Sequence, residues 1–358
     1  MSGGSPRFRR VLDQFAPYQP GRRVSGPGGK SVKLSSNESP FGPLPSVAEA
    51  IAEAVRDVNR YPDNGAADLT QAISRRYAVP REHIAVGCGS VGITQQLLEA
   101  VGEPGAEVLY AWRSFEAYPI LVDLSGASSV RVPLHHETHD LNALAQAITS
   151  RTRVVFVCNP NNPTGTVVHA GPLAEFIDRV PAGCLVVLDE AYAEYVRDPD
   201  VPDGIELYRD RPNLAVLRTF SKAYGLAGLR VGFMVAHPGV AGAVRKTMLP
   251  FAVNAIGQAA AIASLAAEGE LLERVAVVVK ERARVRDELL AQGWAVPPTE
   301  ANFVWLRLAE DTQDFTLACE RAGVSVRAFG AEGARVTIGD HHENDAFLEV
   351  AREYPRRH

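Results

Sequence analysis

The chain has 358 residues and a formal net charge of -5, with 46% hydrophobic and 22% charged residues. This length exceeds what one hydrophobic core comfortably serves, so we expect two domains in a globular protein of ordinary composition. The acidic balance and the lack of a long basic run argue against a nucleic-acid partner. Without an 18-residue apolar run, we expect no membrane span.

Cysteine usage and the N-terminal residues favour a cytoplasmic protein. No apolar signal core follows Arg7, Arg9 and Arg10. The four cysteines are scattered without a Cys-x-x-Cys pair, which argues against zinc and against a disulfide framework. We therefore expect a cytoplasmic location and no bound metal.

The chain begins with an irregular arm. Residues 1–30 are rich in Arg, Gly and Pro, and they place Tyr18 where no core is yet available. Residues 33–36 read as a short strand, followed by a turn-rich loop over 37–43. Apolar spacing predicts helices over 46–59 and 67–77, separated by a loop that contains Tyr61.

A glycine-rich segment between a strand and a helix matches the G-x-G-x-x-G pattern. The strand at 84–86 runs into Gly87-Cys88-Gly89-Ser90-Val91-Gly92, and a helix follows over 93–101. A dinucleotide fingerprint also requires an acidic residue about 20 positions on, closing the next strand. That strand, 108–112, runs into Arg113 instead. The glycines still suit a phosphate cradle, because Ser90 can cap a helix whose free N–H groups face an anion.

Aromatic and histidine residues follow this strand. Phe115 and Tyr118 could each offer a platform for a flat cofactor ring, and ordinary core packing is the alternative. The segment 135–139 contains three histidines but no partner motif, so we interpret it as a solvated loop.

Polar residues follow the carboxyl ends of two predicted buried strands. The strand at 153–157 leads into a loop with two Asn-Pro steps, which can present the Asn162 amide rigidly. After a helix over 173–180, the strand at 184–188 ends in Asp189-Glu190-Ala191-Tyr192. A carboxylate there is costly to bury without a cationic partner, and ligands collect at this edge of a doubly wound sheet.

The segment after the next strand, 214–217, carries a lysine among phosphate-binding residue types. Lys222 lies between Ser221 and a glycine-rich stretch that ends at Arg230. A desolvated lysine suits Schiff-base chemistry, and Thr219, Ser221 and Arg230 are donors that can grip a phosphate. A surface lysine in a glycine-rich loop is the alternative for this segment taken alone.

The order of elements predicts two domains. Strands and helices alternate from about 84 to 235, which is typical of a mostly parallel sheet with helices on both faces. Helices over 259–272 and 275–292, antiparallel strands over 303–306 and 335–338, and a helix over 343–354 then indicate an α+β domain. We expect an N-terminal arm (1–30) packed with the small domain, a large domain (31–250) and a small domain (251–358).

The polar residues together match the needs of pyridoxal phosphate. This cofactor requires a lysine, an acid for its ring nitrogen, a partner for its ring hydroxyl, a ring platform and a phosphate cup. The residues that fill these roles lie at the ends of successive predicted strands: Lys222, Asp189, Asn162, Phe115 and Ser90.

With these motifs the chain resembles fold-type-I, class I/II aminotransferases, and their histidinol-phosphate aminotransferase branch in particular. The matching segments are 17–21, 36–38, 60–63, 159–165, 189–192, 221–230, 301–303 and 335–337. The resemblance implies an α/β fold and a homodimer that takes an amino acid and a 2-oxo acid.

The resemblance also implies roles for individual residues. Lys222 would be the Schiff-base lysine and proton shuttle, and Asp189 would contact the pyridine nitrogen. The cofactor's ring and phosphate would be held by Asn162, Tyr192, Phe115, Ser90, the Val91 amide, Thr219, Ser221, Arg230 and Tyr61 of a second subunit. The substrate would be held by Arg335, Arg327, Asn37 and Tyr18.

Two segments favour one group within this branch. Residues 87–91 and 112–119 look most like actinobacterial aromatic (phenylalanine) aminotransferases, whereas Val91 and Gly92 replace the acidic pair usual in histidinol-phosphate enzymes. This implies ping-pong transfer between phenylalanine, tyrosine or tryptophan and 2-oxoglutarate. A histidinol-phosphate aminotransferase is the alternative, and a decarboxylase would share every cofactor residue. A DNA-binding regulator is excluded, because the N-terminal 30 residues cannot house a helix-turn-helix.

Overall fold

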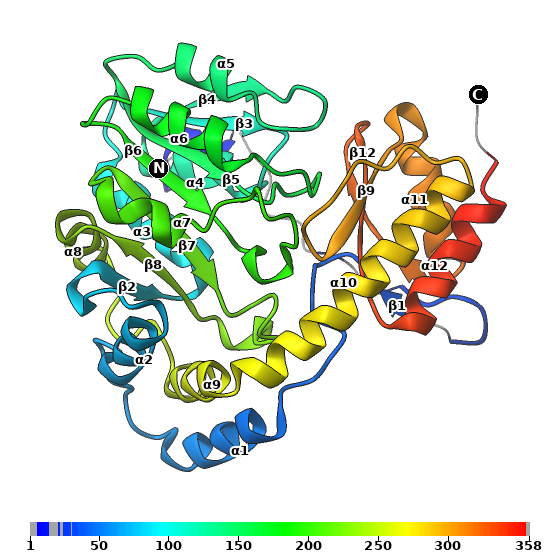
Figure 1. Cartoon of the computed structure of the whole chain (residues 1–358), viewed down its shortest axis with the longest axis horizontal. Helices are drawn as coiled ribbons and strands as arrows, with labels where there is room; N and C mark the ends of the chain where they lie inside the picture. Colours follow the sequence, from blue (N-terminus) through cyan, green and yellow to red (C-terminus); the bar gives the residue numbers. More distant parts are fainter. Residues whose placement is uncertain (1–5, 14–20, 22–23, 30, 356–358) are drawn as a thin grey trace, which may run out of the picture.

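The computed structural model describes residues 6–13, 21, 24–29 and 31–355. Its largest sheet has seven strands (Figure 1). In spatial order these are β2 (Ile84–Gly87), β8 (Gly232–Ala236), β7 (Leu214–Thr219), β6 (Leu185–Asp189), β5 (Thr152–Cys158), β3 (Glu107–Trp112) and β4 (Ser128–Pro133). All run parallel except β8, which is antiparallel to both neighbours. The mostly parallel sheet expected from the sequence is therefore confirmed.

The central strands are apolar because helices cover both faces of the sheet. Successive side chains alternate between two cores: Val154 and Phe156 of β5 point to one, Val155 and Val157 to the other. The first core is completed by α3 (Gly89–Val101), α4 (Ala117–Ser125) and α8 (Pro238–Lys246). The second core is completed by α2 (Ala67–Tyr77), α6 (Ala170–Arg179), α7 (Gly204–Leu207) and α9 (Ala255–Ala266), with α5 (Leu141–Gln146) beside α6.

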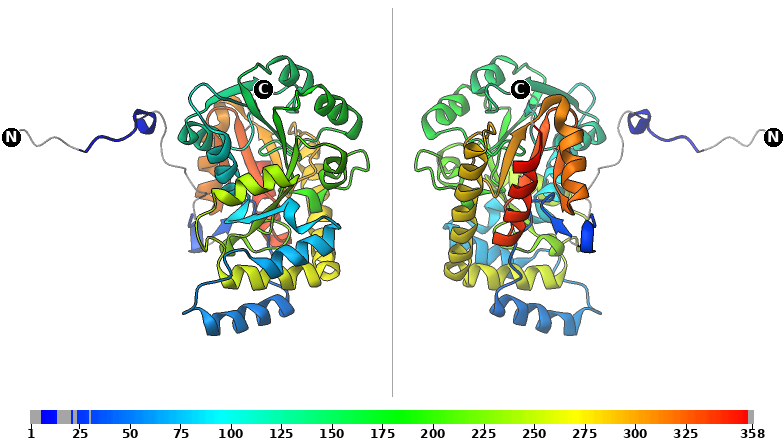
Figure 2. Two further views of the ribbon diagram at one scale, coloured as in Figure 1. Left: turned by 90° about the vertical axis from the view of Figure 1, so that its left-hand side faces the viewer. Right: turned by 90° about the vertical axis from the view of Figure 1, so that its right-hand side faces the viewer.

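A smaller antiparallel sheet lies beside the large one (Figure 1). Its order is β11 (Arg327–Phe329), β12 (Gly333–Thr337) and β9 (Phe303–Arg307). Figure 2 shows α12 (His341–Glu353) between α10 (Glu268–Ala291) and α11 (Thr312–Arg321) on its outer side. The short strand β1 (Val32–Lys33) pairs with β10 (Val324–Ser325), so the chain just after the arm joins this part. The α+β character expected for the C-terminal region matches these elements, and the domain boundaries remain a prediction.

Several helix boundaries differ from the expected ones, and two of the differences concern where a helix ends. The first helix, α1 (Pro45–Ala54), ends five residues early and continues as a 3-10 turn, Val55–Asp57. The expected helix over 259–272 is wrong at its end, because the chain breaks at Ala267 (φ -102°, ψ 24°). Gly269, a poor helix former, lies just beyond the break and weakens the run. The resulting helix α9 packs against α1 and α2.

The remaining short elements are 3-10 helices. They cover Arg10–Asp13, Pro27–Gly29, Arg81–His83, Ala193–Tyr195, Tyr208–Asp210, Ala227–Leu229 and Ala309–Asp311. Across the described residues, no helix combines the length and apolar character needed to cross a bilayer.

Candidate active site

A cavity of about 550 Å³ opens where the carboxyl ends of β5, β6 and β7 face the smaller sheet. It brings together residues from positions 21 to 335. The sequence-predicted residues that line it are Asn37, Ser90, Val91, Phe115, Asn162, Asp189, Tyr192, Thr219, Ser221, Lys222, Arg230, Arg327 and Arg335. The parallel register explains the convergence, because Cys158 of β5 lies opposite Asp189 of β6 and both strands end there.

Asp189 is a buried carboxylate of which one oxygen accepts a hydrogen bond. The Tyr118 hydroxyl donates a 2.7 Å hydrogen bond to Asp189 Oδ2, whereas Oδ1 accepts no hydrogen bond from the described residues. Burial raises the pKa of Asp189, and the Tyr118 hydrogen bond and the charge of Lys222 oppose this. A buried carboxylate oxygen at a cavity wall suits a protonated ring nitrogen, which would supply the missing partner.

Phe115 lies at the cavity wall, whereas Tyr118 lies in the core behind it. Phe115 lines the cavity, and its ring meets Tyr118 edge-on at 5.4 Å. Tyr118 is fully buried, stacked on Phe156 at 4.6 Å, and holds Asp189. Of the two aromatics, Phe115 is therefore the one that can face a cofactor ring. The role of Tyr118 could not be read from the sequence, because its partner is 71 residues away.

Lys222 is poised to react as a neutral amine. Burial is the largest cause that lowers its pKa from 10.5 to about 7, and the charges of Arg335 and Arg230 act in the same direction. Its Nζ donates to the Ser36 carbonyl at 3.2 Å. The buried neighbours Phe220 and Ala223 fix the backbone on either side of the lysine.

The first turn of α3 and the connection between β7 and β8 form a cup. The Arg230 guanidinium donates to Ser221 Oγ at 3.1 Å. A Cβ on Gly89 (φ 73°) would approach Arg230 Nη2 to 2.5 Å, so this position needs glycine. Because α3 begins at Gly89 with Cys88 as its N-cap, the expectation that Ser90 caps the helix is wrong. Ser90 instead lies in the first turn, where backbone N–H groups lack helical partners and suit a phosphate.

The wall opposite Lys222 links the two sheets. Arg335 of β12 donates to Asn162 Oδ1 at 2.5 Å and to the Ser35 carbonyl at 3.0 Å. Asn37 Nδ2 donates to the Tyr192 hydroxyl at 2.9 Å, and the Thr337 hydroxyl donates to Asn37 Oδ1 at 3.1 Å. This wall therefore holds an arginine and a tyrosine in fixed positions.

One predicted residue, Tyr61, does not line this cavity. Tyr61 is 81% exposed and stacks on Phe251 with ring centroids 4.5 Å apart. Tyr18 falls outside the described residues. The cavity wall also contains residues to which the sequence analysis assigns no role, among them Gly21, Ser35, Cys158, Ala117, Ile120 and Leu121.

The histidine segment is only partly a solvated loop. His135 and His136 are exposed, but His139 is buried and hydrogen-bonded to Asn161 Oδ1 at 3.1 Å. Burial lowers the pKa of His139 to about 4, so the prediction of solvation is wrong for this residue. Within the described part of the chain, no group of three or more His, Cys, Asp or Glu side chains is placed to hold a metal.

An ionic cluster around the buried Arg218 and Glu190 supports the strand that carries Asp189. Arg218 of β7 contacts Glu190 Oε2 at 2.6 Å and Asp203 Oδ1 at 2.9 Å. Burial alone would lower the pKa of Arg218, but the neighbouring carboxylates raise it above its ordinary value. No sequence motif marks Arg218 as functional, because it directly follows an apolar run in a central strand.

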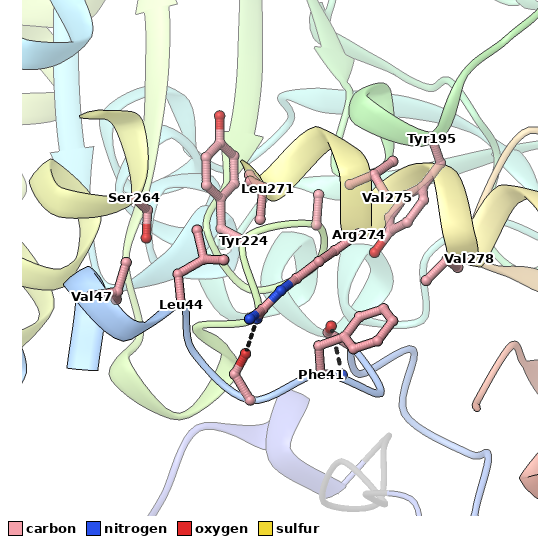
Figure 3. A pocket seen from close by; sticks show the side chains of 14 residues that line it. Phe41, Leu44, Val47, Tyr195, Tyr224, Ser264, Leu271, Arg274, Val275 and Val278 are labelled. Carbon is pink, nitrogen blue, oxygen red and sulfur yellow. Dashed lines mark hydrogen bonds between the residues drawn. The ribbon is translucent and has the colours of Figure 1, made fainter. Parts of the chain in front are cut away.

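A second hollow lies behind the lysine loop, between α1 and α10 (Figure 3). Its room for a water-sized sphere is about 10 Å³, which suits at most one water. Arg274 crosses it and donates to the Gly42 carbonyl at 2.6 Å. This hollow is therefore a place where α10 packs against the loop before α1 and the loop after Lys222, and it is too small for a ligand.

The doubly wound sheet, the buried lysine and the carboxylate with an unfilled oxygen define a fold-type-I pyridoxal-phosphate enzyme. The family model "Aminotransferase class I and II" matches residues 29–350, and the chain belongs to this family. The protein is an aminotransferase that uses pyridoxal 5'-phosphate.

Known relatives are similar over the whole chain. The chain is 70% identical over 352 residues to an aromatic amino acid aminotransferase of Thermobifida fusca (strain YX), covering 98% of each protein. It is 59% identical over 355 residues to a protein of the same name from Streptomyces coelicolor, covering 99% of each. Among solved structures, it is similar to the histidinol-phosphate aminotransferase from Sinorhizobium meliloti in complex with pyridoxal-5'-phosphate. That match has a TM-score of 0.89 at 31% identity and covers 99% of this chain and 98% of the other.

Proposed function

We propose that this aminotransferase moves an amino group between an aromatic L-amino acid (phenylalanine, tyrosine or tryptophan) and 2-oxoglutarate by a ping-pong mechanism. The observation that carries the proposal is the apolar cavity wall next to the polar one. Phe115, Ala117, Ile120 and Leu121, from α4 and the residues before it, line the cavity that also contains Arg335. The names of the relatives at 70% and 59% identity support the same substrate class.

We propose the cofactor roles that the family resemblance implies for these cavity residues. Asp189 Oδ1 would hold the ring nitrogen, Asn162 and Tyr192 the ring hydroxyl, and Phe115 one ring face. The phosphate would be held by Ser90, the Val91 amide, Thr219, Ser221 and Arg230. When bound, pyridoxal phosphate supplies an aldehyde and an electron-withdrawing ring that stabilises negative charge at the substrate's α-carbon.

The chain's own groups would bind the substrate and move the proton. Arg335 would hold the α-carboxylate, because a guanidinium matches a carboxylate in two hydrogen bonds. Lys222, whose amine is neutral over much of the physiological pH range, would accept the substrate's α-proton at Nζ. It would then donate this proton to the cofactor. Asn37 would keep the Tyr192 hydroxyl oriented through its 2.9 Å hydrogen bond. A donor and then an oxo acid would use the same cavity in turn, which is the basis of the ping-pong order.

A donor panel with 2-oxoglutarate tests the proposal. We expect kcat/KM for phenylalanine, tyrosine and tryptophan to exceed that for histidinol phosphate, with parallel double-reciprocal plots. Intersecting plots would refute the ping-pong order. A clear preference for histidinol phosphate would refute the aromatic specificity and leave the aminotransferase class intact.

We further propose a homodimer in which Tyr61 serves the phosphate of the partner's site. Exposed apolar side chains near Tyr61 in sequence or in contact with it support this: Val55, Val58, and Phe251 with its neighbour Leu249. Phe251 has a φ of 59°, costly for a bulky residue, and stacks on Tyr61. Sedimentation of Phe251→Asp should give monomers, whereas Tyr61→Phe should stay dimeric and bind the cofactor more weakly. Monomeric wild-type enzyme would contradict the proposal.

We also propose that Tyr18 closes the cavity over the substrate and that the enzyme works in the cytoplasm. Gly21, three residues after Tyr18, lines the cavity, which supports an arm passing over it. Tyr18→Ala should raise KM for phenylalanine more than for glutamate, and equal effects would contradict the lid. The four cysteines are unpaired, which supports a reducing compartment.

A further inference from the structure

An ion pair lies at the rim of the apolar wall. Glu116 is the residue just before α4, and Arg327 is the first residue of β11. Arg327 Nη2 donates to Glu116 Oε2 at 3.0 Å, and Arg327 Nε approaches the same oxygen at 3.3 Å. The side chains of Arg327 and Glu116 are 14% and 25% exposed, so the pair is largely withdrawn from solvent.

This pair determines which charge the cavity offers next to its apolar wall. Arg327 lines the cavity, as do Phe115 and Ala117 on either side of Glu116 in sequence. A neutral aromatic side chain against this wall leaves the pair intact. An anionic side chain that approaches Arg327 must displace Glu116 or lie beside it, and like charges in a partly desolvated site repel strongly.

We propose that Glu116 is a specificity-determining residue that acts by occupying Arg327. It disfavours donors with a second anionic group, phosphate monoesters most and dicarboxylates less, relative to neutral aromatic donors. The inference rests on the proposed function, since it explains how an arginine in the cavity is compatible with an aromatic preference. Phosphate monoesters are affected most because they carry up to two negative charges, whereas a distal carboxylate carries one.

A second ion pair provides a matched control. Arg113 Nε donates to Glu332 Oε1 at 3.1 Å, linking the chain before α4 to the turn between β11 and β12. It bridges the same two parts of the molecule as the Glu116–Arg327 pair, but neither of its residues lines the cavity. Loss of Glu332 therefore removes a comparable bridge without changing the charge at the substrate.

The experiment measures kcat and KM of the holoenzyme for phenylalanine, glutamate and histidinol phosphate in wild type, Glu116→Gln, Glu116→Asp and Glu332→Gln. We expect Glu116→Gln to raise the kcat/KM ratio of histidinol phosphate to phenylalanine by about tenfold, mainly through KM. The kcat/KM ratio of glutamate to phenylalanine should rise less. Glu116→Asp should stay close to wild type, and Glu332→Gln should leave both ratios within about twofold.

The outcomes separate specificity from structure. Unchanged ratios in a folded Glu116→Gln enzyme would overturn the inference, as would an equal change in Glu332→Gln. Because Gln keeps the shape of Glu, we expect the thermal midpoint to stay near that of wild type. If wild type prefers histidinol phosphate, the proposed function fails. The change in the kcat/KM ratio of histidinol phosphate to phenylalanine from wild type to Glu116→Gln still decides the role of Glu116.

Discussion

The lowered pKa of Lys222 predicts an unusually reactive amine in the cofactor-free protein. With a pKa of about 7 instead of 10.5, about three quarters of Lys222 side chains are neutral at pH 7.5, against about one in a thousand for an ordinary lysine. Burial is the largest cause, and the charge of Arg335 is the next. Arg335→Gln removes that like charge and should move the midpoint from about 7 to about 8.

Competitive labelling with limiting acetic anhydride measures this midpoint. The peptide that contains Lys222 is quantified by mass spectrometry across pH 5.5–11, with the exposed Lys246 and Lys280 as internal references. Arg307→Gln, at an exposed position of β9 outside the cavity, serves as the control and should leave the midpoint in place. A Lys222 midpoint near 10 in wild type would refute the reasoning.

The same shift has a consequence for stability. Since the pKa in the folded protein is lower than 10.5, the unfolded chain binds more protons between pH 7 and 10.5. The contribution of Lys222 to the free energy of unfolding is therefore fully present above pH 10.5 and is lost as the pH falls towards 7.

Three further substitutions test the supports of the site. Asp189→Asn should lower kcat by on the order of 10²-fold, by analogy with losing one preorganised electrostatic partner, and a loss below about threefold would mark Asp189 as structural. Tyr118→Phe removes the donor to Asp189 Oδ2 and should lower the free energy of unfolding by about 1–3 kcal/mol in urea titrations, whereas no change would show that this hydrogen bond is unimportant. Arg218→Met leaves the buried Glu190 unpaired and should cost about 3–5 kcal/mol, and a neutral result would contradict the assigned pairing.

Elements with local signals could be predicted from the sequence, and those defined by packing could not. The helix expected over 67–77 is α2, with the same bounds, because apolar Leu69 and Ile73 recur at helical spacing. The sequence pattern predicts no element over residues 117–133, where the structure has α4 and β4. Most of α4 is apolar and Pro119 interrupts its start, so it lacks the polar face that marks a surface helix.

The site residues also fall into those that the sequence predicts and those that only the packing of the two sheets brings together. Asp189, Asn162 and Lys222 were predictable because they follow buried strands, and a parallel sheet places such positions together. Glu116 and Arg327 were not paired by the sequence, since they are 211 residues apart and meet only when the two sheets face each other. Tyr61 is exposed and does not line the cavity of its own chain, so its role remains a prediction.

The charges around the cavity are unlike those of the whole protein. The chain carries a formal net charge of -5, yet the described residues lining the cavity include the cations Arg230, Arg327 and Arg335, the largely neutral Lys222 and the single carboxylate Asp189. A basic cleft in an acidic protein focuses its field towards the opening, which attracts anions and raises their encounter rate. Pyridoxal phosphate and 2-oxo acids are both anions. Added salt shortens the screening length from about 10 Å at 0.1 M to about 3 Å at 1 M, so their association should slow with ionic strength while dissociation changes little.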